Sequence, residues 1–159
     1  MLYSVKHRPQ YYTGGYMLES LILKKKFLFN APVEAVWDAL TNPEKIKRYL
    51  FGTKAVSDWK EGSPLRFTGE WDGKQYTDKG TVLKFEKNKI FQYNYWSSFS
   101  PLPDKPENYS VLTFVLSSNG QQTLLTFEQK GFFDEKSFNH SDENWESVMK
   151  TMKAIVEEG

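Results

Sequence analysis

Residues 141–158, Ser-Asp-Glu-Asn-Trp-Glu-Ser-Val-Met-Lys-Thr-Met-Lys-Ala-Ile-Val-Glu-Glu, decide the fold. At 100° per residue their apolar side chains fall within an arc of about 120°, and most of the charged ones lie outside it. The apolar positions are Trp145, Val148, Met149, Met152, Ile155 and Val156. This spacing predicts one long helix, capped by Ser141, with Asp142 and Glu143 at the positive end of its dipole. A helix with one narrow apolar stripe needs a partner, and we expect it to lie across a curved sheet.

The sequence before this helix has the pattern of strands joined by turns. Strands are predicted at 18–29, 54–57, 64–71, 75–85, 90–96, 109–116 and 121–130. Asp72-Gly73 and Asn119-Gly120 are hairpin signals. Three prolines favour a loop at 97–108. The run Lys24-Lys25-Lys26 is interpreted as a solvated strand end.

Two short helices are predicted after the first strand. Pro32 stands in the first turn of one of them, where its missing N–H costs nothing. That helix has an apolar stripe made of Val33, Val36, Trp37 and Leu40. Pro43 starts the second, which runs to about Tyr49. The order is therefore strand, two short helices, six strands and a long helix, which is an α+β chain.

Length and composition limit the domain count and the class of protein. The 159 residues predict a single helix-and-sheet domain at 18–159, preceded by a flexible leader at 1–17 that includes Pro9 and Gly14-Gly15. Twenty-one basic residues against 20 acidic ones leave a net charge of +1, which argues against a nucleic-acid partner. No run of 18 apolar residues predicts a membrane span, and no apolar segment follows Lys6 and Arg8 as in a secretory signal. We therefore expect a cytoplasmic protein.

The chain offers little for catalysis or metal binding. It has no cysteine, which excludes thiolate metal sites, disulfides and cysteine nucleophiles. Its two histidines are His7, in the predicted leader, and His140, just before the predicted helix cap. We predict no metal and no cofactor.

Several segments resemble one known family. They are Val-Glu-Ala-Val-Trp-Asp-Ala-Leu-Thr-Asn-Pro-Glu-Lys-Ile-Lys-Arg-Tyr-Leu at 33–50, Trp59-Lys60-Glu61-Gly62-Ser63, Gly73, Gly80-Thr81-Val82, Asn94-Tyr95-Trp96 and Asn144-Trp145. Together they resemble the C-terminal-domain family of the activator of heat-shock-protein ATPase, in the START-like (SRPBCC) superfamily. The resemblance implies the helix-grip fold: an antiparallel curved sheet of about seven strands, two short helices after strand 1, and a long C-terminal helix across the sheet. Superfamily members bind lipids, plant hormones and polyketides, and some are cyclases or hydrolases.

The 26 aromatic residues either fill the space between sheet and helix or line a pocket there. An apolar void of ~300 Å³ would cost about 7 kcal/mol, so a void of that size would be kept only for a function. Strand parity and the helix stripe predict an inward, ligand-binding set: Phe67, Trp71, Tyr93, Tyr95, Val111, Thr113, Val115, Leu125, Phe127, Trp145, Met149 and Met152. A single bulge would instead turn inward the opposite face, which includes Glu70, Gln92, Asn94, Trp96, Phe114 and Glu128.

Three functions remain open from the sequence. The first is non-enzymatic binding of a small, largely apolar molecule (lipid-like or aromatic), with the 97–108 loop at the mouth of the pocket. The second is a protein-interaction module resembling the cochaperone domain, with an exposed patch drawn from Phe99, Leu102, Phe132, Phe133 and Phe138, and its partner is another protein or a second copy of the chain. The third is a cyclase or hydrolase, which needs His140 or an inward acid among Asp58, Glu70, Asp78 and Glu128.

Overall fold

The computed structural model describes residues 17–158. One curved seven-stranded sheet has the order β1-β7-β6-β5-β4-β3-β2, and every neighbouring pair is antiparallel. The strands are β1 (Leu18–Phe29), β2 (Lys54–Ser57), β3 (Pro64–Trp71), β4 (Lys74–Glu86), β5 (Ile90–Tyr95), β6 (Ser110–Asn119) and β7 (Gln122–Phe132). The helices are α1 (Val33–Thr41), α2 (Pro43–Tyr49) and α3 (Glu135–Glu157), with a 3₁₀ turn η1 (Pro106–Asn108) before β6.

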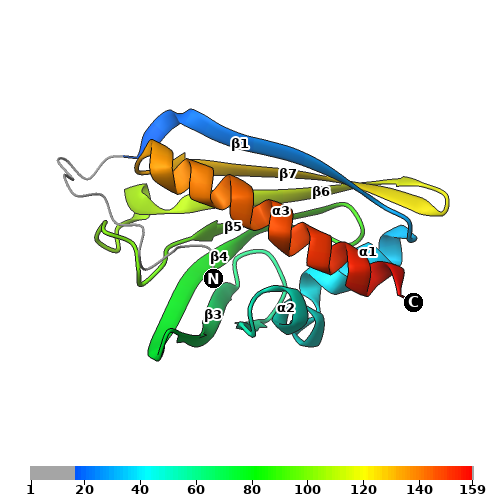
Figure 1. Cartoon of the computed structure of the whole chain (residues 1–159), viewed down its shortest axis with the longest axis horizontal. Helices are drawn as coiled ribbons and strands as arrows, with labels where there is room; N and C mark the ends of the chain where they lie inside the picture. The colour runs from blue at the N-terminus through cyan, green and yellow to red at the C-terminus, as the bar shows by residue number, and fades with distance from the viewer. Residues whose placement is uncertain (1–16, 159) are drawn as a thin grey trace.

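Figure 1 shows α3 crossing one face of the sheet, with α1 and α2 beside its C-terminal half. This is the helix-grip fold, and the predicted order of elements is confirmed. The leader predicted over 1–17 lies, except for Met17, outside the described residues, so that boundary stays a prediction.

Helix α3 begins at Glu135, six residues before the start predicted from sequence. Asp134 is the N-cap: its carboxylate accepts the Ser137 N–H at 2.7 Å, while the Ser137 hydroxyl lies 3.4 Å from the Asp134 N–H. The prediction that Ser141 caps this helix is therefore wrong, because Ser141 is buried inside the helix. His140, predicted to precede the helix, also lies within it. The apolar spacing becomes regular only at Trp145, which made the helix look shorter than it is.

Side chains of α3 hold the edge strand β1 at two places. Lys25 forms ion pairs with Asp142 and Glu146. Further along, the Lys153 ammonium donates to the Leu28 carbonyl at 2.8 Å. β1 is an edge strand, with a strand neighbour on one side only. These contacts with α3 therefore hold in place an edge to which a strand of another molecule could otherwise pair.

Lys25 does not belong to a solvated strand end, contrary to the sequence interpretation. It shares the inward face of β1 with Leu23 and Phe27, and its side chain is only 13% exposed. Burial opposes its charge, but the hydrogen bonds to Asp142 and Glu146 outweigh that effect and raise the pKa of the ammonium.

The position of the α3 cap can be tested by two substitutions. We expect Asp134→Ala to lower the free energy of unfolding by about 1 kcal/mol, because the N–H of Ser137 loses its acceptor. Ser141→Ala, inside the helix, should change it by less than about 0.5 kcal/mol. Urea titration followed by circular dichroism measures both. A larger loss for Ser141→Ala than for Asp134→Ala would contradict this helix start.

Candidate ligand-binding cavity

A cavity lies where α3, the α1–α2 pair and the inward faces of β3, β5 and β6 meet. It is lined by Leu40, Ile46, Tyr49, Leu50, Trp59, Phe67, Phe91, Tyr93, Phe114, Trp145 and Met149. Among residues 17–158, no Lys, Arg, His, Asp or Glu lines it. The void measures about 20 Å³, which is room for one water. A void of that size costs about 0.5 kcal/mol, so aromatic rings have filled most of the space between sheet and helix.

The structure places four of the predicted site residues on this cavity: Phe67, Tyr93, Trp145 and Met149. Four others are buried but do not line it: Tyr95, Leu125, Phe127 and Met152. These four pack in the same hydrophobic core, so their side chains support the cavity wall without facing the void.

The inward placement predicted for Val111, Thr113 and Val115 is wrong. On β6 the buried face carries Leu112 and Phe114, while Val115 is 39% exposed. Both faces of this strand carry apolar side chains, so alternation alone could not choose between them. The bulkier side chains pack against α3: the ring centroids of Phe114 and Trp145 are 5.7 Å apart.

The inward placement of Trp71 is also wrong, for a different reason. Trp71 shares the parity of Phe67, but it is the last residue of β3, beside the Asp72-Gly73 turn, and extends past the core. It is 39% exposed and packs edge-on against Phe51, also exposed, at a centroid distance of 6.3 Å.

The residues missed by the sequence analysis come mainly from the helices and loops. Phe91 shares the parity of Tyr93 and Tyr95 along β5, so the same pattern could have included it. Tyr49 and Trp59 reach the cavity only through tertiary packing.

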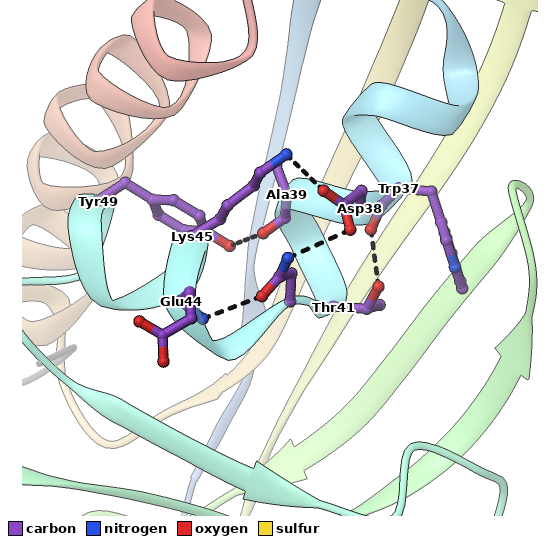
Figure 2. Close-up of polar contacts among 8 residues, drawn as sticks. Trp37, Asp38, Ala39, Thr41, Glu44, Lys45 and Tyr49 are labelled. Carbon is purple, nitrogen blue, oxygen red and sulfur yellow. Dashed lines mark hydrogen bonds and ion pairs between the residues drawn. The ribbon is translucent and has the colours of Figure 1, made fainter.

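Tyr49 is held in place by the turn between α1 and α2, which Figure 2 shows. The Asn42 side chain caps α2 by accepting the Glu44 N–H at 3.1 Å, and Lys45 forms an ion pair with Asp38 of α1. This close packing brings the Tyr49 hydroxyl within 2.9 Å of the Ala39 carbonyl, to which it donates. The hydroxyl of Tyr49 is therefore already bonded within the protein.

Trp59, on the loop between β2 and β3, is the half-buried part of the cavity wall. Its φ of 56° lies in the left-handed region, which is costly for a bulky side chain. The Ser57 hydroxyl accepts its backbone N–H at 3.1 Å, and its ring lies 6.0 Å from that of Phe91. The backbone at Trp59 is thus fixed, while the side chain stands between the void and solvent.

Tyr93 carries a hydroxyl for which the described residues provide no hydrogen-bond partner. The residue is 4% exposed, and within the described part of the chain no residue makes a hydrogen bond to its hydroxyl. Burial, and then the nearby charge of Asp78, raises the pKa of Tyr93, so the proton stays on the oxygen. The cavity therefore contains a neutral hydroxyl donor among apolar side chains.

Of the four acids proposed as inward, Asp78 is the buried one, at 1% exposure. Its carboxylate accepts the Tyr95 hydroxyl on one oxygen, and the Ser97 hydroxyl at 2.9 Å and Ser98 N–H at 3.3 Å on the other. Burial raises the pKa of the Asp78 carboxyl, and these hydrogen bonds offset only part of that effect. Asp78 does not line the void. Its hydrogen bonds to Ser97 and Ser98 instead hold the start of the 97–108 loop in place.

A surface groove of about 690 Å³ runs between β1 and α3. Phe27, Leu28 and Met149 provide its apolar side chains, and Lys26 and Lys150 are among its charged ones. Met149 lines both this groove and the inner cavity, so one flexible side chain separates the two.

Two expectations about the outer surface are wrong. No residue of the 97–108 loop lines the cavity, so the loop does not border its mouth. Of the aromatic patch proposed for a protein partner, Phe99, Leu102, Phe132 and Phe133 are all buried. The remaining member, Phe138, packs edge-on against Phe132 at 5.1 Å.

No helix between residues 17 and 158 is long and apolar enough to cross a membrane. In the same part of the chain, no three His, Asp or Glu side chains are grouped closely enough to hold a metal ion.

A curved sheet gripped by a long helix, with an apolar cavity between them, defines a helix-grip protein of the ligand-binding class. Residues 30–157 match the family model described as Activator of Hsp90 ATPase homolog 1-like protein, and the chain belongs to that family. The resemblance inferred from the sequence is thereby confirmed.

Solved structures agree with this assignment. ChR145 of Cytophaga hutchinsonii is 44% identical, with a TM-score of 0.77 over 89% of this chain and 97% of that one. MLL2253 of Mesorhizobium loti, at 23% identity, has a TM-score of 0.71 over 86% and 97% of the two chains. CalU16 of Micromonospora echinospora, also at 23%, has a TM-score of 0.63 over 85% and 74%. The last two share the fold alone. No curated protein matches this chain.

Removing the hydroxyl from each of the two tyrosines of β5 should change the stability of the protein by different amounts. We expect Tyr95→Phe to lower the free energy of unfolding by about 1–3 kcal/mol, because one oxygen of the buried Asp78 loses its donor. Tyr93→Phe should lower it by no more than about 0.5 kcal/mol, since no protein bond is lost. Chemical denaturation measures both, and equal losses would contradict the hydrogen-bond assignment.

The buried carboxyl also predicts a pH dependence. Because the pKa of Asp78 is raised in the folded state, its contribution to stability is greatest below about pH 4 and is lost as the pH rises through the folded pKa. The unfolding free energy of the native protein, relative to Asp78→Asn, should therefore fall as the pH rises above about 4.

Asp104 provides the matched control for this measurement. The hydrogen bond from Lys79 holds the pKa of Asp104 below its ordinary value, so the same comparison with Asp104→Asn should stay flat above about pH 4 and fall only as the pH drops below that. A difference between native protein and Asp78→Asn that stays flat or rises with pH would rule out the raised pKa.

Proposed function

We propose that this protein binds a small, largely apolar molecule in the cavity between its sheet and α3, as a non-enzymatic carrier or sensor in the cytoplasm. The observation that carries the proposal is the composition of the cavity wall: seven aromatic side chains, three aliphatic ones and Met149, with no charged group among them in residues 17–158. Concave, apolar walls with few polar groups are typical of small-molecule sites.

The ligand would have to enlarge a void that has room for about one water. Two parts of the wall support such an expansion. Met149 has an unbranched side chain that adapts to different neighbours, and it faces the groove on its other side. Trp59 is half-buried on a loop, so its ring can move outward without disturbing a strand.

The two alternative functions have less support. A cyclase or hydrolase would need His140 or an acid at the cavity wall, and no His, Asp or Glu of residues 17–158 lines it. The buried acid, Asp78, has both oxygens bonded to protein groups. A protein-interaction module would need an exposed patch, and the aromatic residues proposed for it are mostly buried.

Met149→Trp tests the proposal, with the neutral fluorophore N-phenyl-1-naphthylamine as the probe. The added indole should fill the space that a ligand would take, so we expect fluorescence titration to show affinity reduced at least about 10-fold. Overpacking of this kind costs about 1–3 kcal/mol, so thermal unfolding must first show that the variant is folded.

Two further variants make the test specific. Thr151→Trp adds the same ring to the exposed side of α3 and should leave probe binding unchanged. Met149→Ala enlarges the void and should bind the probe at least as tightly as the native protein, although it loses about 2–5 kcal/mol of stability. Undiminished binding by a folded Met149→Trp would show that the probe binds elsewhere.

A further inference from the structure

We propose that the cavity selects a neutral aromatic molecule with one hydrogen-bond-accepting oxygen, such as an aryl ketone, and that the Tyr93 hydroxyl recognises that oxygen. The proposal rests on the proposed function, because it names the class of ligand for the same cavity. It also assigns a specificity-determining residue.

The first observation is the contrast between Tyr93 and the buried tyrosines near it. Tyr49 donates to the Ala39 carbonyl, Tyr76 shares a 2.5 Å hydrogen bond with a threonine, and Tyr95 donates to Asp78. Tyr93 is as buried as they are, yet its hydroxyl bonds to no residue between 17 and 158. The Tyr93 oxygen is not one of the enclosed, unpartnered side-chain atoms of the described residues, so it keeps contact with space outside the protein. An acceptor from outside the protein, either water or a ligand oxygen, is therefore its expected partner.

The second observation is the ring environment around that hydroxyl. The Tyr93 ring lies 5.2 Å from Phe91, 5.7 Å from Phe67 and 6.0 Å from Phe114, measured between centroids. Trp59 and Trp145 complete the aromatic wall. Planar rings gain both burial and favourable ring–ring geometry against such a wall, which favours a flat aromatic ligand over a flexible chain.

The third observation concerns charge. No cationic side chain of the described residues lines the cavity, so a carboxylate or phenolate bound there would be buried without a counter-ion. The carboxyl of Asp78, close enough to Tyr93 to affect its titration, would add repulsion. A carbonyl oxygen accepts the tyrosine proton without bringing a charge, so the ligand class is a neutral carbonyl compound.

Three naphthalenes of similar shape separate these requirements: 2-acetylnaphthalene, 2-ethylnaphthalene and 2-naphthoate. Binding to the full chain can be followed by isothermal titration calorimetry. We expect the ketone to bind about 3- to 10-fold more tightly than the ethyl compound, which is the range of one neutral hydrogen bond. Naphthoate should bind at least about 10-fold more weakly than the ketone.

Two tyrosine variants then locate the effect. Tyr93→Phe should bind the ketone and the ethyl compound equally, with affinity for the ethyl compound unchanged. Tyr49 lines the same cavity, but its hydroxyl donates to the Ala39 carbonyl and is not available to a ligand. Tyr49→Phe should therefore keep the preference for the ketone.

The outcomes distinguish this proposal from the proposed function. If the native protein binds the ethyl compound but does not prefer the ketone, or if the preference survives Tyr93→Phe, the role of Tyr93 is wrong while the apolar site stands. If no naphthalene binds the native protein at all, both proposals fail.

Discussion

The packing of α3 on the curved sheet is the contact on which the rest of the structure depends. At its centre the Trp145 ring lies 4.6 Å from Phe127 and 5.7 Å from Phe114, so one side chain of the helix meets two neighbouring strands. The indole N–H donates to the buried Gln129 side chain at 3.2 Å, so this ring is buried without an unpaired donor. Lys25 and Lys153 then join the edge strand to the same helix.

That packing also explains why the cavity is small. A helix lying across a curved sheet leaves space at the concave face, and an empty space of several hundred Å³ would consume much of a domain's stability. Here aromatic side chains from β3, β5 and β6 fill the space from one side, and Leu40, Ile46 and Tyr49 fill it from the other. What remains is a water-sized void whose walls include two adaptable parts, Met149 and Trp59. The native core is therefore nearly closed.

Two polar side chains of this interior, Asp78 and Tyr49, have clear structural roles. Asp78 is held by three donors and anchors the loop after β5, which explains how a carboxyl can be buried there. Tyr49 joins α1 to α2. The Tyr93 hydroxyl lacks such a role within the described residues, and the proposed ligand preference rests on this exception.

The sequence by itself determined the order of elements, the helix-grip fold and four residues of the cavity wall, because hydrophobic periodicity and hairpin signals are local properties of the chain. It could not orient β6, whose two faces are both apolar, and it began α3 too late, because the first turns of that helix carry few apolar residues. Only tertiary structure brought Tyr49 and Trp59 to the cavity, buried Asp78, and decided which hydroxyls found partners. Those features depend on which side chains meet across distant segments and how completely they fill the space between them, and local pattern holds no information about either.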